Sequence, residues 1–534
     1  MEAQRAHESK LRGAVFPRGA IRPYPSAGLW RGEHDVRPRV TALLFALVVL
    51  SLPLQGQGFK FGGLEINVNF MVCALFTLVV LFRLPHFPLS SDKWYLLFLG
   101  WCVLSIVHNF GIHTSAGRSS SPLGAQGIGA TQVRWLYHFA RLCLVWLFFR
   151  SVFNYLVATP RSVGNLISWL RKACWFLLLY GTYQLIGAPR GWPLIAMNNL
   201  HYGQEIQRMF SRFADVDRVF ATFAEPKGYA LFLNFVLPLL IGRYLLDLKT
   251  RHSRVAHDPS LIPRFVNGQL VLIVGLVFHL FLTASVGGLV AFFLQMLVLV
   301  VLARRKPVLI VVAALILAIG GASVLWIDKS PAEFFRLMTW ELTRTETGTA
   351  GWYRALARIN WRMILERPIL GHGPGGLVFA RPSFWIYGPF EERISRVGWG
   401  DGSGVVLYVL GSAGFVGGLF FAAFFISHIR AATTAIMRRR LSSQGEFLLP
   451  FAFASFIGLA IHFVVLAVWN QLHIWLALAL VAFLCQGQGL RPFKPSRARA
   501  FGLGRRTRWA KHPPGKGPKL GTFSATGQHG LPYT

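Results

Sequence analysis

Twelve apolar blocks of about 15 to 25 residues divide most of the chain, and they constrain its fold more than any other feature. A helix needs about 20 mainly apolar residues to cross a hydrocarbon core about 30 Å thick. The blocks lie at residues 40–56, 66–83, 94–108, 133–155, 165–187, 226–246, 268–284, 286–303, 307–327, 403–427, 447–468 and 470–487. We therefore predict an all-α polytopic membrane protein of about twelve transmembrane helices.

The composition indicates one membrane domain rather than several soluble domains. Hydrophobic residues make up 54% of the chain and charged residues 14%, against about 45–50% apolar and 25% charged residues in soluble domains. The five cysteines lie in apolar blocks without CxxC spacing, so we expect neither disulfides nor a zinc site. The first block begins only near residue 40, so no cleavable signal peptide is expected.

Basic residues in the loops predict the orientation. If the blocks cross the membrane in turn, four basic clusters and both termini fall on one side, which the positive-inside rule identifies as the cytoplasm. The clusters are Arg161, Arg171 and Lys172; Lys249, Arg251 and Arg254; Arg304, Arg305 and Lys306; and Arg438, Arg439 and Arg440.

The same pattern divides the chain into a membrane domain, residues 40–487, and two basic cytoplasmic tails, residues 1–39 and 488–534, the second of them predicted to be disordered. The net charge of +34 lies largely in these tails and in short loops. We expect it to set the topology and to contact anionic membrane lipids, not nucleic acid.

We expect three long stretches, residues 109–131, 188–225 and 328–402, on the periplasmic face. The third lies between the ninth and tenth helices and contains a segment of helical character at 351–366. Its arginines recur every four residues and so share one helix face. They are Arg354, Arg358 and Arg362. Pro368 and the glycines of GHGPGG (371–376) are expected to end this helix.

Cationic side chains near the outer boundary are candidate substrate ligands. Arg134, His138 and Arg141 share one face at the outer end of the fourth helix, where they either form a wall for an anionic substrate or reach the head groups and neighbouring helices. Arg218 precedes a helix that begins at Pro226, and an arginine beside free helix amides is well placed to bind a phosphate.

Three groups are candidates for proton transfer: Glu225, His372 and Asp401. Each carboxylate stands just before a helix, where it either accepts a proton or caps the helix. His279 and His462 lie inside predicted helices and are expected to be packed and hydrogen-bonded. The chain has no Walker A loop, HExxH or EF-hand loop, and we expect no cofactor and no metal.

Three local patterns resemble the O-antigen ligase and O-antigen polymerase superfamily, which are integral-membrane glycosyltransferases. Residues 218–234 resemble its Arg, small residue, aromatic, Pro, helix pattern, with Ala221 where Gly is usual. Residues 367–376 (RPILGHGPGG) resemble its Pro-(Leu/Ile)-Leu-Gly-x-Gly motif. Gly414 and Gly417 resemble the Gly-x-x-Gly that follows the ligase histidine.

The chain departs from this family at two places. Ser403 occupies the position of the ligase histidine, with Asp401 beside it. In the segment TASVG (283–287), Val286 replaces the arginine of a family Ser-Arg-Gly pattern. The usual assignment of the general base therefore does not transfer to this chain.

The resemblance implies an inverting, metal-independent transfer in the bacterial inner membrane, with an undecaprenyl-diphosphate-linked glycan as donor and a glycan or lipid A core as acceptor. Both a polymerase and a ligase fit these motifs, and the absence of the ligase histidine slightly favours a polymerase or a divergent exopolysaccharide enzyme. A transporter or flippase and a non-catalytic assembly component are the alternatives. The implied diphosphate ligands are Arg218, Arg354, Arg358, Arg141 and His138, and the candidate bases are Glu225, His372 and Asp401.

Overall fold

The computed structural model divides the chain into two units, residues 1–489 and 490–534. The second unit lies wholly outside the residues that the structure describes. Those described are 37–54, 58–61, 64–116, 128–159, 162–187, 190, 192, 212–213, 216–223, 225–255, 268–303, 310, 314, 336, 349–380, 384, 404–437, 443–465 and 471–486.

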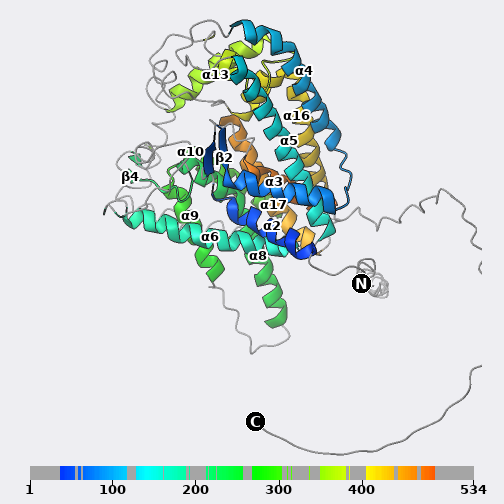
Figure 1. Ribbon diagram of the computed structural model, residues 1–534. Helices are drawn as coiled ribbons and strands as arrows, with labels where there is room; N and C mark the ends of the chain where they lie inside the picture. Colours follow the sequence, from blue (N-terminus) through cyan, green and yellow to red (C-terminus); the bar gives the residue numbers. More distant parts are fainter. Residues whose placement is uncertain are drawn as a thin grey trace, which may run out of the picture. The chain divides into compact units, whose positions relative to one another are not determined.

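The first unit is built mainly from α-helices (Figure 1). The helices are α2 (Arg37–Ser51), α3 (Val68–Arg83), α4 (Asp92–Ala116), α5 (Ile128–Ala158), α6 (Ser162–Gly187), α8 (Pro226–Val255), α9 (Gly268–Leu282), α10 (Val286–Ala303), α13 (Thr349–Glu366), α14 (Leu377–Ala380), α16 (Val405–Met437), α17 (Ser443–Val465) and α18 (Leu472–Gln486). A helix is therefore found at every predicted apolar block except 307–327, which lies outside the described residues apart from Ile310 and Ala314.

Three described helices are long and apolar enough to cross a membrane: Trp135–Ala158 of α5, Pro226–Leu248 of α8 and Val405–Met437 of α16. The described parts of α2, α3, α9, α10, α17 and α18 are shorter apolar helices. The prediction of a helical membrane protein is supported at this level.

Two short antiparallel hairpins were not predicted. Strand β1 (Gly58–Phe61) pairs with β2 (Leu64–Asn67), and β3 (Arg212–Phe213) pairs with β4 (Val216–Asp217). The second falls between apolar blocks and the first at the edge of one, and all four strands are too short to show a strand pattern. The second hairpin leads directly into the Arg218 segment.

Helix α8 lies at the centre of the packing, against α9, α10 and α17. Its Asn234 donates hydrogen bonds to the carbonyl of Gly288 (2.9 Å), while Gln295 donates to the carbonyl of Asn234 (2.8 Å). Ser455 of α17 donates to the carbonyl of Phe235 (2.8 Å). Polar side chains buried among apolar helices need such partners, and these bonds fix how the helices pack.

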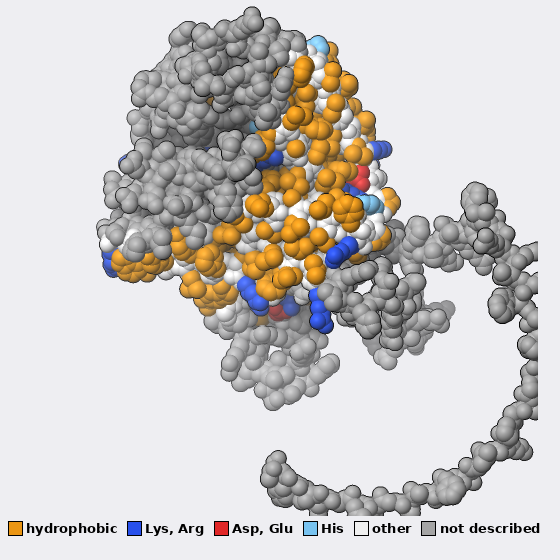
Figure 2. Space-filling view, viewed as in Figure 1, with side chains coloured by type: hydrophobic (Ala, Val, Ile, Leu, Met, Phe, Trp, Pro, Cys, Tyr) orange, Lys and Arg blue, Asp and Glu red, His pale blue; other side chains and the backbone are white. Residues whose placement is uncertain are grey.

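The outward faces of the helices carry large apolar side chains. Hydrophobic side chains cover most of the described surface on the face drawn in Figure 2. Large exposed apolar residues include Leu78 and Phe82 of α3, Val107 of α4 and Leu419 of α16. A soluble monomer rarely exposes so much contiguous apolar surface. This surface is the kind that lipid covers.

Candidate active site

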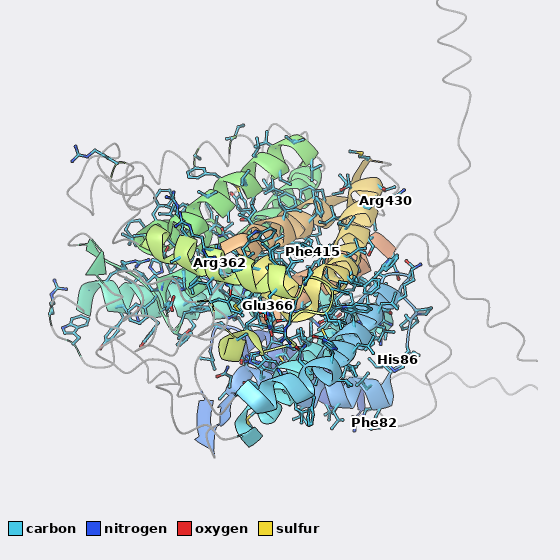
Figure 3. The ribbon with its side chains drawn as sticks, turned by 90° about the horizontal axis from the view of Figure 1, so that it is seen from above. Phe82, His86, Arg362, Glu366, Phe415 and Arg430 are labelled. Atoms are coloured by element: carbon cyan, nitrogen blue, oxygen red, sulfur yellow. The ribbon has the colours of Figure 1, made fainter. Side chains whose placement is uncertain are left out.

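The helix predicted in the large polar loop is confirmed as α13. Leu356, Ile359 and Met363 of α13 are buried, and the helix packs on α16. The rings of Trp361 and Phe415 lie 6.4 Å apart in an edge-on arrangement at this contact. Figure 3 labels Arg362 and Glu366 of α13 and Phe415 of α16.

The arginines of α13 face away from that contact. Arg354, Arg358 and Arg362 are all exposed, in agreement with the shared helix face that their four-residue spacing predicted. They are available to an anion, but α13 does not itself enclose them.

The GHGPGG segment that follows α13 is a tight turn docked on α16. Its glycines at 371, 373 and 375 adopt positive φ angles of 68°, 82° and 76°, respectively. The amides of His372 and Gly373 donate to the carbonyls of Gly411 (2.8 Å) and Ser412 (2.9 Å). In the reverse direction, the amide of Phe415 donates to the carbonyl of Pro368 (2.7 Å).

This docking occupies a break in α16. Gly414 leaves the helical conformation (φ 65°, ψ −173°), so the carbonyls and amide around it are released from the helix and pair with the loop. A methyl group at Gly414 would overlap the carbonyl oxygen of Ile369, and one at Gly371 would lie 2.6 Å from the carbonyl carbon of Ser412. The two glycine motifs therefore form one structure, in which each allows the other backbone to approach.

His372 lies inside this turn, with 1% of its surface exposed. Its Nε2 is 3.0 Å from the carbonyl oxygen of Met363, so Nε2 carries the proton and donates it. Burial lowers the pKa of His372 to about 4, and the charge of Arg367 acts in the same direction, while the bond to Met363 opposes it. At neutral pH the neutral imidazole ties the turn to α13.

Helix α5 meets the same turn. His138 is buried, with Nδ1 3.2 Å from the hydroxyl oxygen of Tyr408 on α16, and its ring lies directly against Gly375. The structure thus brings together His138 and His372, which are far apart in sequence. Arg141 lies one turn further along α5, with its guanidinium over the rings of Phe70 (4.8 Å) and Tyr137 (5.1 Å). The side chain of Arg134 lies outside the described residues.

Arg218 lies at the turn between α9 and α10. Its Nε donates to the carbonyl of Thr283 (2.8 Å) and its Nη2 to that of Ala284 (3.4 Å). The amide of Val219 donates to the carbonyl of Leu282 (3.0 Å). The first family motif is therefore fastened to the TASVG segment (283–287).

The backbone conformation of Ala221 explains why glycine is usual at this position of the motif. Its φ is 46°, in the left-handed region that disfavours a side chain, and Ala284 has a similar φ of 45°. Gln184 of α6 holds Ala221 there from both sides, since it accepts from its amide (2.7 Å) and donates to its carbonyl (2.9 Å).

Glu225 stands immediately before α8. Its carboxylate is 12% exposed and lies 2.6 Å from Nζ of Lys227. Its backbone carbonyl accepts from the amides of Gly228 (3.0 Å) and Tyr229 (3.3 Å), so the residue also begins the helix. Asp401 and Ser403 lie outside the described residues.

The arginines expected to share one diphosphate lie on different elements. Arg218 contacts the α9–α10 turn, Arg141 packs on rings of α3 and α5, and Arg354 is exposed on α13. Among the described residues, no group of three or more His, Cys, Asp or Glu is arranged to hold a metal ion.

Sequence reasoning missed Asn109 and Arg367. Arg367 of the turn donates from Nη1 to Oδ1 of Asn109 in the C-terminal part of α4. The only sequence feature that distinguishes Asn109 is that it is a polar residue at the end of an apolar block. Two of its partners, Gly371 and Arg367, lie more than 250 positions away in the chain.

The long apolar helices, together with the GHGPGG turn docked on the broken helix α16, identify the chain as a helical membrane protein. Residues 271–422 match the family model described as O-antigen ligase. This match supports the resemblance to the O-antigen ligase and polymerase superfamily that the motifs indicated, for this stretch of the chain. A comparison with curated proteins finds no match.

The matched stretch includes most of α9, together with α10, α13, the GHGPGG turn and the broken start of α16. Two of the three motifs, at 367–376 and 414–417, lie inside it, and the Arg218 segment lies before it. The match to this stretch supports O-antigen ligase-like glycan transfer in general.

Proposed function

We propose that this protein transfers or polymerises undecaprenyl-diphosphate-linked oligosaccharide at the periplasmic face of the bacterial inner membrane, in O-antigen or exopolysaccharide biosynthesis. One observation carries the proposal. The hallmark turn after α13 and the Gly-x-x-Gly segment of α16 are joined by reciprocal backbone hydrogen bonds, inside the stretch that matches the family. The acceptor is another lipid-linked glycan in a polymerase, and lipid A core or another final acceptor in a ligase.

The topology that goes with this function has twelve spans, a membrane domain at 40–487, cytoplasmic tails at 1–39 and 488–534, and periplasmic loops at 188–225 and 328–402. The described helices coincide with the apolar blocks on which it rests. The polar residues of the site, from His138 to the GHGPGG turn, then lie at the periplasmic ends of α4, α5 and α16, which neighbour one another (Figure 1).

The proposed reaction is a displacement at the anomeric carbon of the donor. The acceptor hydroxyl oxygen forms the new bond to this carbon from one face, the bond to the diphosphate oxygen breaks on the other, and the configuration inverts. The diphosphate leaves with the electron pair, and the hydroxyl proton passes to a base. Since the diphosphate is a good leaving group, fixed cations that neutralise its developing charge are sufficient, without a metal.

Arg218 is the principal proposed cation, because two backbone carbonyls hold its guanidinium in place at low conformational cost. Arg354 and Arg358 reach the diphosphate from the exposed face of α13 when it covers the donor. His138 and Arg141 complete the cationic wall from α5.

Glu225 is the leading candidate base of the three. Its carboxylate is largely shielded and paired with Lys227, yet it is not fully buried. His372 is enclosed and donates its Nε2 proton to Met363, which suits it better to holding the turn than to meeting an acceptor. Asp401 remains the alternative carboxylate.

The glycan profile of a deletion strain tests the proposed function. Single repeat units on the final acceptor identify a polymerase, and long chains left on the lipid carrier identify a ligase. A profile unchanged from the parent strain contradicts both. The deletion strain is complemented with the wild-type gene as the control.

A lipid-linked glycan transporter or flippase is the second candidate, because transporters also use broken helices at their binding sites. The break in α16, however, is filled by the carbonyl of Pro368 from the same chain. A flippase moves its substrate without forming a glycosidic bond, so a new covalent product separates the two functions.

A further inference from the structure

Arg367 is a half-buried cation at the junction between α13 and the GHGPGG turn. Its amide donates to the carbonyl of Met363 (3.3 Å), and its carbonyl accepts from the amide of Gly371 (3.0 Å). The backbone of Arg367 is therefore fixed on both sides. Its guanidinium extends towards the outer end of α4, where Nη1 donates to Oδ1 of Asn109.

Asn109 is itself held rigidly. It is 0% exposed, and its Nδ2 donates to the carbonyls of Ser105 (2.7 Å) and Gly371 (2.9 Å). With both amide protons committed, the orientation of Oδ1 is set, and it accepts from Arg367. The guanidinium is thus placed by a buried network that joins α4 to the hallmark turn.

The charge of Arg367 is not neutralised by this network. Within the part of the chain that the structure describes, no carboxylate lies within ion-pair distance of its guanidinium, whereas Arg150 pairs with Asp92 (3.3 Å) and Arg243 with Asp247 (3.1 Å). Asn109 is a neutral acceptor. A half-buried guanidinium with only a neutral partner attracts an anion, and its planar fork suits the oxygens of a phosphate.

The two elements that carry this cation and its partner also expose apolar side chains. Val107 and Phe110 of α4 are 67% and 50% exposed, and Ile369, two residues after Arg367, is 61% exposed. Trp101 donates from Nε1 to the carbonyl of Ile369 (3.2 Å), which holds that part of the turn against α4. A fixed cation on elements that also expose apolar side chains fits an amphiphile that has an anionic head and a hydrocarbon chain.

We infer that Arg367 binds the phosphate of a membrane lipid whose hydrocarbon chain lies along Val107, Phe110 and Ile369, and that Asn109 positions it. Two lipids share this chemistry, a polyprenyl diphosphate and an anionic glycerophospholipid. In the first case the inference rests on the proposed function, because the lipid is then the carrier end of the donor. In the second, the site anchors the outer loop to the bilayer.

Lipid binding by the purified full-length protein tests this inference independently of glycan transfer. Native mass spectrometry would measure the retention of undecaprenyl diphosphate, phosphatidylglycerol and uncharged undecaprenol by the wild type, Arg367→Gln and Arg367→Lys. The matched control is Arg430→Gln, which removes an exposed charge from the opposite end of α16 (Figure 3). Thermal unfolding midpoints would confirm that every variant is folded.

We expect Arg367→Gln to weaken the binding of a phosphate-bearing lipid about 10- to 100-fold, as for the loss of a charge-assisted hydrogen bond. Arg367→Lys should retain part of the binding, and Arg430→Gln all of it. Weakening of undecaprenyl diphosphate identifies the carrier lipid as the occupant, and weakening of phosphatidylglycerol alone identifies a bilayer lipid. Equal retention of both lipids by Arg367→Gln and the wild type would overturn the inference, as would an equal loss of undecaprenol.

The same measurement separates this inference from the proposed function. If the protein binds the carrier lipid through Arg367 but makes no glycosidic product, the lipid site is supported and the proposed transferase function is wrong. If the protein makes the product and the Arg367→Gln variant binds lipid normally, the transferase function is supported and the lipid site is wrong.

Discussion

The backbone amide of Phe415 donates a 2.7 Å hydrogen bond to the carbonyl of Pro368, across the break that Gly414 makes in α16. In a continuous helix that amide would pair four residues back. The exchange joins the end of α13 to α16 through main-chain groups, so the position of the turn does not depend on any single side chain.

Gly414→Ala should therefore disrupt the docking. The added methyl group would overlap the carbonyl of Ile369, and a φ of 65° is unfavourable for alanine. We expect a loss of more than about 2 kcal/mol in stability, together with loss of transfer activity. Thermal unfolding in detergent and the transfer assay would measure the two effects.

Gly100→Ala is the matched control, because no atom lies within 4 Å of the methyl group that it adds to α4. It should be neutral or slightly stabilising. Equal stability of Gly414→Ala and Gly100→Ala would contradict the docking described here.

Ala221→Gly should stabilise the protein by about 1 kcal/mol, because glycine relieves the left-handed conformation at φ 46°. Ala357→Gly, inside the helix α13, should instead destabilise it by about 1 kcal/mol. Unfolding midpoints of the two variants would be compared with the wild type. A loss of stability in Ala221→Gly would show that Ala221 is not under backbone strain.

Much of the fold follows from local patterns. Apolar blocks place α8 and α16, and the sequence GWYRALARINWRMILE with the glycines after it places α13 and its end. The hydrogen bond from Asn109 to Gly371 joins residues 262 positions apart, and no local pattern encodes such a contact. The role of His372 also depended on the fold, because only the burial of its ring and its bond to Met363 distinguish a structural histidine from an exposed base.

His372 should make the stability of the turn depend on pH. The folded protein holds the pKa of His372 at about 4, against about 6.5 in the unfolded chain. As the pH falls from 6.5 towards 4, the unfolded chain takes up a proton that the folded protein does not, so the folded state loses up to about 3 kcal/mol. The contribution is fully present above pH 6.5.

Unfolding midpoints between pH 7.5 and pH 4.5 would test this for the wild type and His372→Gln, whose side chain does not titrate. The wild type should lose more stability on acidification than the variant. Parallel curves for the two proteins would mean that His372 titrates alike in the folded and unfolded states.

Glu225→Gln should lower the rate of transfer about 100- to 10,000-fold if its carboxylate accepts the acceptor proton, with little change in unfolding midpoint. Lys227→Met removes the ammonium 2.6 Å away, so it should move the acid limb of the pH–rate profile to higher pH. Normal transfer by Glu225→Gln, with loss of activity in Asp401→Asn, would move the base role to Asp401.

Covalent glycan transfer by the purified protein tests the central claim most directly. The protein would be incubated in nanodiscs, without added metal, with a synthetic undecaprenyl-diphosphate-linked oligosaccharide and a glycan acceptor. We predict a new inverted glycosidic product and released undecaprenyl diphosphate with the wild type, and a strongly reduced rate with Arg218→Ala. Absence of product from folded wild-type protein with both polymerase and ligase acceptors, or an undiminished rate with Arg218→Ala, would contradict the account.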